Sequence, residues 1–251
     1  MNPGIIPSLN DHIGHILLNR PEQHNAINKE MWQALPQAMA QLQQEGARCV
    51  VISGEGDDFS SGANTAEAAK LTSFDEAREH WHAIRDSLCA VYNFELPTIA
   101  MIHGVCFGGG CLLASACDLR VASEESNFAV PVARLGLALD DTTVARLVEL
   151  VGPANAKKLL LLGDSINASE AYHMGLVNTV VPAANLKTTT DTYAKRICAN
   201  VSSSVISCKK SINRIACKEA FCPEDNDKEV VSAFISQVFQ DKLKSRRSDK
   251  S

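Results

Sequence analysis

The 251-residue sequence has no apolar run long enough for a membrane span. Its first residues carry Pro, Gly and charge too early for the apolar region of a signal peptide. The nine Cys residues form no CxxC motif and no cluster with His, so neither a disulfide framework nor a metal site is expected. These absences together predict a cytoplasmic protein with reduced thiols, no membrane anchor and no bound metal.

Several motifs of nucleotide-binding proteins and hydrolases are also missing. No Gly-Lys-Ser/Thr follows the glycines of 103–110, which excludes a P-loop. The sequence has no GxGxxG in a strand-to-helix turn and no GxSxG nucleophile elbow. The net charge of -5 and the pI of about 5.8 argue against a nucleic-acid partner.

The pattern that is present alternates strands and helices. Hydrophobic residues make up 45% of the chain and charged residues 21%, as in ordinary globular proteins. Short apolar runs predict strands at 12–19, 49–53, 96–104, 118–123 and 176–181. Helices are predicted over 25–46, over 74–92, from 140–142, from Pro153 and after a Ser169 cap. From 184 onward the pattern is helical, which predicts an α/β core (1–183) with a helical C-terminal region (184–251).

Two segments share one design, a strand followed by a glycine-containing loop and the start of a helix. They are CVVISGEGDDFSSGAN (49–64) and TIAMIHGVCFGGGC (98–111). Glycine allows close approach of a backbone, and a helix N-terminus leaves N–H groups unpaired. Two such loops side by side would aim two N–H donors at one oxygen, as in an oxyanion hole. The residues alone leave open the alternative that both loops are tight turns.

Several motifs together resemble the crotonase, or enoyl-CoA hydratase/isomerase, superfamily. They are NRPEQHNAIN (19–28), FSSGAN (59–64), HGVCFGGGCLLASACDLRVAS (103–123) and VGPANAKKLLLLGDSINASEAYHMGLVNTVV (151–181). The resemblance covers nearly the whole chain and implies a spiral of ββα turns. It further implies an acyl-CoA thioester as ligand, with coenzyme A entering only as part of the substrate. A homotrimer or a dimer of trimers is implied, with 184–251 as the trimerisation region.

The resemblance also implies site residues. The backbone N–H groups of Ala63 and Gly109 would be the oxyanion donors. The adenine and pantetheine would lie along Ala26 and the 62–66 stretch, which includes Gly62 and Asn64. Asn64 stands where the family usually has Asp, a difference that leaves the backbone donors possible.

Both glutamates of the family's hydratases are missing. Leu112 stands two residues after the triple glycine, and Val132 follows Pro131, at the two positions where the resemblance expects Glu. Alkene hydration needs one group to activate water and another to deliver a proton, and Leu and Val do neither. Ordinary hydratase activity is therefore not expected.

One carboxylate remains at a position that resembles the catalytic Asp of family isomerases. Asp140 would move a proton while the oxyanion hole holds the enolate, which predicts an enoyl-CoA isomerase. Asp is also a preferred helix N-cap, so Asp140 as a cap is an equal alternative, with Asp141 or Thr142 as other caps. A catalytically silent acyl-CoA-binding protein and a decarboxylase-type homologue stay open as functions. Arg134 and Arg146 are expected to pair with nearby acids.

Overall fold

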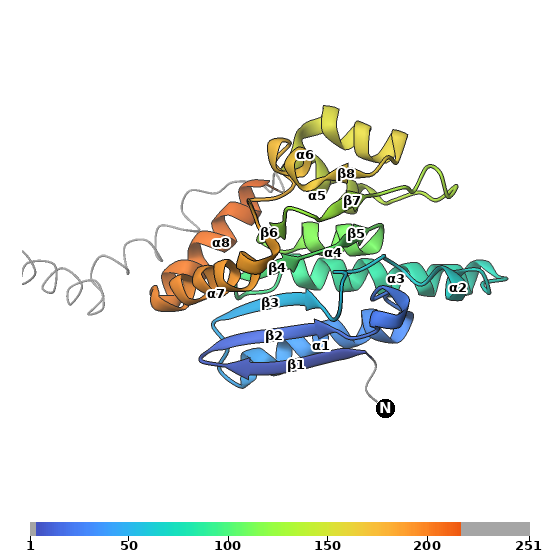
Figure 1. Cartoon of the computed structure of the whole chain (residues 1–251). Coiled ribbons are helices and arrows are strands. Elements are labelled where there is room, and N and C mark those ends of the chain that lie inside the picture. Colours follow the sequence, from blue (N-terminus) through green and yellow to red (C-terminus); the bar gives the residue numbers. More distant parts are fainter. Residues whose placement is uncertain (1–3, 217–251) are drawn as a thin grey trace, which may run out of the picture. The chain divides into compact units, whose positions relative to one another are not determined.

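The computed structural model describes residues 4–216, and the chain divides into two compact units, Met1–Cys198 and Ala199–Ser251. Both sheets belong to the first unit (Figure 1). The described part of the second unit is the helix α8 (Ser202–Ala216). The boundary at 183/184 and the trimerisation role of 184–251 stay predictions, and residues 217–251 of that region lie outside the described residues.

The larger sheet has six strands and is parallel except at one edge. Its order is β1 (Ile5–Asn10), β2 (Ile13–Leu18), β3 (Cys49–Gly54), β4 (Thr98–Ile102), β6 (Leu119–Ser123) and β9 (Thr179–Val181). β1 and β2 form an antiparallel hairpin, and every other neighbouring pair is parallel. The smaller sheet holds β5 (Val105–Phe107), β7 (Asn127–Ala129) and β8 (Ile166–Asn167), with β5 parallel to β7 and β8 antiparallel to it.

Repeated ββα turns connect the two sheets. β4 lies in the large sheet and β5 in the small one, and the helix α4 (Gly109–Ala116) follows. β6 and β7 repeat this step, and α5 (Asp141–Lys157) follows them. The predicted α/β core of ββα turns is confirmed.

Helices cover both faces of the large sheet. Successive residues of a strand point to opposite faces, and Ile13, Cys49 and Val51 form a buried cluster with Leu186 and Ala194 of α7 (Ala183–Ala199). On the other face, Gly14 and Val50 lie against Leu42 of α1 (Lys29–Gln44). The first helix after residue 183 therefore packs on the sheet of the first unit.

The helix boundaries follow their caps. α3 (Phe74–Tyr92) begins as predicted, because Ser73 and Glu76 form a reciprocal capping box. The helix predicted over 25–46 begins later, at Lys29, because Asn28 caps α1. A short 3₁₀ turn, Pro21–Gln23, precedes it. The predicted Ser169 cap was wrong: Asn167 caps α6 (Ala168–His173) in a capping box with Glu170.

The other helices are short or broken. Gly152 has a non-helical backbone (φ 72°), so a second helical stretch begins at Pro153, as predicted. A π-helical turn, Lys158–Leu162, continues it. The small helix α2 (Thr65–Ala68) had no counterpart among the predicted elements.

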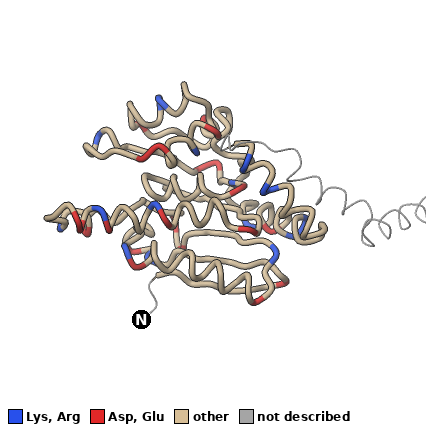
Figure 2. Tube along the Cα trace, turned by 180° about the vertical axis from the view of Figure 1, so that it is seen from behind, with Lys and Arg blue, Asp and Glu red and all other residues tan. Residues whose placement is uncertain are grey.

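Charged residues of both signs are interspersed along the described part of the chain (Figure 2). None of the described helices is long and apolar enough to cross a membrane. Within residues 4–216, no group of three His, Cys, Asp or Glu side chains is placed to hold a metal ion. The cytoplasmic location stays a prediction.

Candidate functional site

The two glycine-containing loops meet at their predicted donor residues. A Cβ placed on Gly62 would lie 2.8 Å from the backbone N of Gly109 and 2.7 Å from the carbonyl O of Phe107. A Cβ placed on Gly109 would lie 3.0 Å from the backbone N of Ala63. Only glycine allows this approach, and Gly62 also has a positive φ of +104°. The sequence-predicted residues Gly62, Ala63 and Gly109 are thus brought together.

The N–H groups of Ala63 and Gly109 have no hydrogen-bond acceptor within the described residues. Gly109 is the first residue of α4, where the helix supplies no acceptor for a backbone N–H. Among the hydrogen bonds of residues 4–216, neither N–H donates to a protein acceptor, whereas the neighbouring N–H of Gly108 donates to Ala129 O at 2.8 Å. Two unpaired main-chain donors therefore lie at one contact between the loops, and their role as an oxyanion hole stays a prediction.

Of the predicted ligand-binding residues, Asn64 ends the first loop, and Ala26 precedes Ile27, which pairs with that loop. Ile27 forms a parallel bridge with Ala63: Ile27 N donates to Gly62 O at 2.8 Å, and Asn64 N donates to Ile27 O at 2.9 Å. The Asn64 side chain accepts hydrogen bonds from the first turn of α2 and acts as its N-cap. Asn64 therefore has a local structural role that the family's Asp could also fill.

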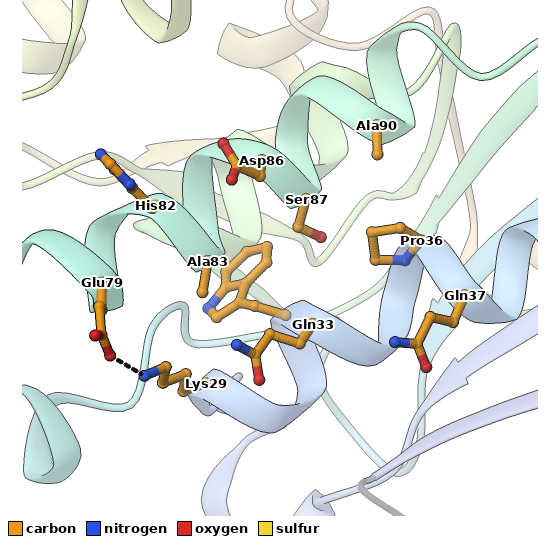
Figure 3. Close-up of a pocket in the computed structure, with 11 residues that line it drawn as sticks. Lys29, Gln33, Pro36, Gln37, Glu79, His82, Ala83, Asp86, Ser87 and Ala90 are labelled. Atoms are coloured by element: carbon orange, nitrogen blue, oxygen red, sulfur yellow. Dashed lines mark hydrogen bonds and ion pairs between the residues drawn. The ribbon is translucent and has the colours of Figure 1, made fainter.

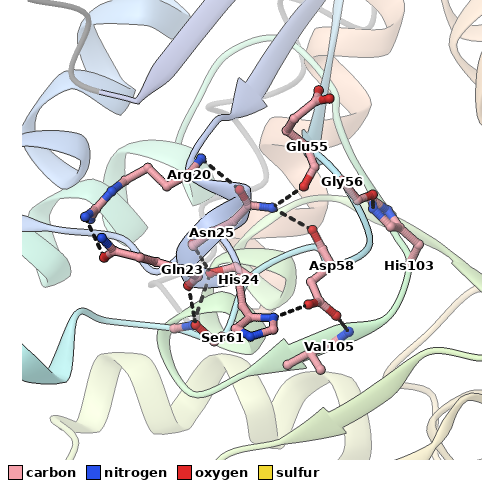
Figure 4. Close-up of polar contacts among 12 residues, drawn as sticks. Arg20, Gln23, His24, Asn25, Glu55, Gly56, Asp58, Ser61, His103 and Val105 are labelled. Carbon is pink, nitrogen blue, oxygen red and sulfur yellow. Dashed lines mark hydrogen bonds and ion pairs between the residues drawn. The ribbon is translucent and has the colours of Figure 1, made fainter.

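A buried asparagine, Asn25, holds the first glycine-containing loop through hydrogen bonds (Figure 4). Asn25 is fully buried with a positive φ of 53°. Its side-chain amide donates to Glu55 O at 2.8 Å and to Asp58 O at 2.7 Å. Its own carbonyl accepts from Ser60 Oγ at 2.8 Å, and Ser60 Oγ accepts from Gly62 N at 3.1 Å. A continuous chain of hydrogen bonds therefore leads from Asn25 to the residue before Ala63.

Asp58 connects the two glycine-containing loops (Figure 4). One carboxylate oxygen accepts from Val105 N at 2.6 Å, at the start of β5. The other lies 2.6 Å from Nδ1 of His24. His103 adds a second link, because its Nε2 lies 2.8 Å from Gly56 O. These contacts fix the spacing between the loops that carry Ala63 and Gly109.

The positions of the two hydratase glutamates hold apolar side chains in the structure. Leu112 is buried in α4, and Val132 is half-buried in the loop after β7. Neither side chain carries a group that can exchange a proton.

Asp140 is the N-cap of α5 and is half-buried. Its Oδ1 accepts a hydrogen bond from Thr143 N at 2.8 Å. The cap therefore uses Asp140 itself rather than Asp141 or Thr142. No other hydrogen bond to its carboxylate occurs within the described chain, so Oδ2 is left without a protein donor there.

The charge of Asp140 acts on two residues of α3. Burial raises the pKa of the Cys89 thiol, and the negative charge of Asp140 raises it further. The hydrogen bond to Asp86 raises the pKa of Arg85, and Asp140 adds to that rise. Asp140 is therefore near the face of α3 that carries Arg85 and Cys89.

A groove of about 660 Å³ lies between α1 and α3 (Figure 3). Its walls carry polar and charged side chains, among them Gln33, Gln37 and the ion pair of Lys29 with Glu79, at 3.1 Å. Two buried groups at this groove, Trp32 Nε1 and Ser87 Oγ, have no hydrogen-bond partner within residues 4–216. The indole of Trp32 also reaches the start of α4, where it lies 3.1 Å from a Cβ built on Gly109. The sequence did not indicate this groove, because it depends on how two helices pack.

Arg134 and Arg146 both form ion pairs, but Arg146 has further partners that were not predicted. Arg134 forms the predicted ion pair, with Asp164. Arg146 pairs with Glu149 at 3.2 Å as expected, but it also donates to Ser115 O at 2.9 Å and to Cys117 O at 3.3 Å. Both carbonyls belong to the C-terminal end of α4, a role that the sequence pattern did not indicate.

Comparison with known proteins identifies the class of this fold. Two sheets joined by repeated ββα turns, with helices at the C-terminal end of the described chain, are the fold of crotonase structures. The family model of enoyl-CoA hydratase/isomerase matches residues 8–246, and the chain belongs to this family.

Relatives and solved structures are similar over most of the chain. A crotonyl-CoA hydratase of Syntrophomonas wolfei is 35% identical over 195 residues, which cover 77% of this chain and 75% of the relative. A structure from Hyphomonas neptunium, described as an enoyl-CoA hydratase/isomerase family protein, superposes with a TM-score of 0.93 at 29% identity and covers 98% of this chain and 95% of that one. An enoyl-CoA hydratase/carnitine racemase of Magnetospirillum magneticum gives a TM-score of 0.92 at 28% identity, covering 98% and 93%.

Proposed function

We propose that this protein is an acyl-CoA enzyme that shifts a double bond in an enoyl-CoA thioester. The observation that carries the proposal is the contact between the two loops, which places the free N–H groups of Ala63 and Gly109 next to each other. Both groups would donate to the thioester oxygen and stabilise the charge that develops on it. The family membership and the hydratase relatives support an acyl-CoA ligand.

A single carboxylate is enough for this reaction. Asp140 would accept a proton from C2 of a 3-enoyl-CoA, and the electron pair would move onto the thioester oxygen as a dienolate. The same carboxylic acid would return the proton to C4, which leaves the conjugated 2-enoyl-CoA and restores the carboxylate. The cap bond occupies Oδ1, so Oδ2 would carry the proton.

Hydration is disfavoured by the same arrangement. Activation of water requires a second acid–base group, and the two positions where hydratases carry Glu hold Leu112 and Val132. Ala26, Gly62 and Asn64, beside the donors, would contact the coenzyme A part of the substrate. A homotrimer or a dimer of trimers remains part of the proposal.

The cap bond of Asp140 and the apolar Leu112 favour one alternative, an acyl-CoA-binding protein without catalysis. A decarboxylase-type reaction is the other, because an oxyanion hole in an apolar site can suffice for it.

The test is an isomerisation assay with 3-enoyl-CoA thioesters on the wild type, Asp140→Asn and Asp141→Asn. Asn is as good an N-cap as Asp, so D140N keeps the helix start and removes only the base. We expect turnover to fall by about 10²–10⁴ in D140N and to stay unchanged in D141N. Acyl-CoA binding by calorimetry should be equal in all three.

Other outcomes decide between the alternatives. Binding without turnover in the wild type would overturn the isomerase and support the binding protein. Loss of CO₂ from a malonyl-type thioester would support the decarboxylase.

A further inference from the structure

The helix that carries Gly109 is held by two arginines at its other end. α4 has eight residues and is about 12 Å long, so its two ends are rigidly coupled. Its last carbonyls have no helical donors. Arg120 Nη1 donates to Cys117 O at 2.6 Å and to Ala114 O at 3.4 Å, and Arg146 donates to Ser115 O and Cys117 O.

Arg120 is the buried member of this pair. Its exposed fraction is 2%, and its guanidinium bonds to carbonyl oxygens rather than to a carboxylate. The remaining acceptors are Leu176 O, Asp118 O and Asn178 Oδ1. Burial lowers the pKa of Arg120 to about 10, so the group stays cationic at neutral pH. Removing it would leave several buried carbonyls without donors and threaten folding.

Arg146 is partly exposed and joins three helices. It belongs to α5, donates to the end of α4, and its guanidinium stacks 4.6 Å above the ring of Tyr92 in α3. Its own helix begins at the Asp140 cap, six residues or about 9 Å earlier. One side chain thus couples the helix with the Gly109 donor to the helix with the Asp140 carboxylate.

The other end of α4 leaves no space for adjustment. A Cβ on Gly110 would lie 2.6 Å from Ser60 O, so the helix start is in tight contact with the first loop. A shift of α4 at the arginine end would therefore press its start against Ser60 or draw it away from the first loop. Cations at a helix C-terminus also stabilise its partial negative charge.

We infer that Arg146 is a positioning residue, which holds the Gly109 N–H and the Asp140 carboxylate in one fixed arrangement around the thioester. This role rests on the proposed function, since it acts on the donor and the base named there. In this role Arg146 would act through its contacts with α4 and α3 and through its own helix α5. Lys is a poor substitute, because an ammonium cannot bridge two carbonyls and stack on Tyr92 at once.

The test compares Arg146→Met, Arg146→Lys and the control Glu149→Gln. E149Q removes the ion-pair partner of Arg146 but no contact to α4. With a 3-enoyl-CoA substrate, we expect kcat to fall by about 10- to 100-fold in R146M with little change in KM. R146K should recover part of the loss, and E149Q should match the wild type.

A second measurement separates positioning from catalysis. Butyryl-CoA has no double bond to shift, and the infrared stretch of its thioester carbonyl reports polarisation by the two N–H donors. We expect a lower frequency on binding to the wild type and E149Q, and a smaller shift in R146M. If R146M does not fold, R146K is compared with the wild type in the same two measurements.

The outcomes are distinguishable. A wild type that polarises the carbonyl without isomerising, with the polarisation reduced in R146M, supports the positioning role and overturns the isomerase. Equal kcat and equal carbonyl frequency in R146M and the wild type overturn the positioning role alone. If the carbonyl frequency of butyryl-CoA does not shift on binding to the wild type, the positioning role of Arg146 is overturned as well.

Discussion

Gly62→Ala tests the contact between the two loops most directly. The added methyl group would lie 2.7 Å from Phe107 O and 2.8 Å from Gly109 N, both main-chain atoms that cannot move aside as a flexible side chain does. Overpacking of this kind costs about 1–3 kcal/mol. A positive φ at a residue other than glycine costs about 1–3 kcal/mol more.

We therefore expect G62A to lower the free energy of unfolding by about 2–6 kcal/mol. For a chain of this size that corresponds to a fall in melting temperature of about 4–24 °C. Separation of the loops should also misplace the donors, and a displacement of about 1 Å can reduce turnover about 100-fold. The assay is thermal unfolding by circular dichroism together with 3-enoyl-CoA turnover.

Gly46→Ala is the matched control. Gly46 has a similar φ of +96°, but a Cβ there meets nothing within 4 Å. This variant should show only the cost of the backbone conformation and keep wild-type turnover. If G62A and G46A lose equal stability and both retain activity, the argument from loop contact is refuted.

Two further predictions concern stability. Ser87→Ala should raise the free energy of unfolding by about 1 kcal/mol in urea titrations, because it removes from a helix a buried hydroxyl without a partner among the described residues. The control is Ser115→Ala, which removes a hydroxyl bonded to Cys111 O at 2.7 Å and should not raise the free energy of unfolding. A less stable S87A would show that the Ser87 hydroxyl has a hydrogen-bond partner. Burial lowers the pKa of His15, so below about pH 6.5 the unfolded chain binds a proton more readily than the folded one. The stability present above that pH should be lost as the pH falls toward the lowered pKa, and urea titrations at pH 7.5 and 5.5 should show a smaller loss for His15→Gln; an equal loss in both proteins would contradict this assignment.

Local signals in the sequence predicted the elements that local interactions determine. The Ser73–Glu76 capping box marked the start of α3, and Gly152–Pro153 marked the break in the helical region after Asp140. The error at α6 has the same origin, since Glu170 lies three residues after Asn167 and selects it over Ser169 as the cap.

Elements that depend on distant partners were missed. β5 and β7 have three residues each, too few for a detectable alternation, and they exist because they pair with each other. The same holds for the site. The strand–loop–helix design left open whether the two loops meet or are separate tight turns, and the resemblance to the family pointed to Ala63 and Gly109. The contacts of Arg146 with α4 depend on packing between helices that no local pattern encodes.

The two donors at the loop contact belong to the main chain, and this has a consequence for how the site can diverge. Only a substitution to proline removes the N–H of Ala63 or Gly109. Other substitutions can change the position of these N–H groups only by altering the shape of the two loops. Substitutions at other positions, such as Leu112 and Val132 where the resemblance expects Glu, leave both main-chain N–H groups in the chain. A scaffold of this kind can exchange its acid–base groups over evolutionary time while its means of holding an oxyanion is inherited intact.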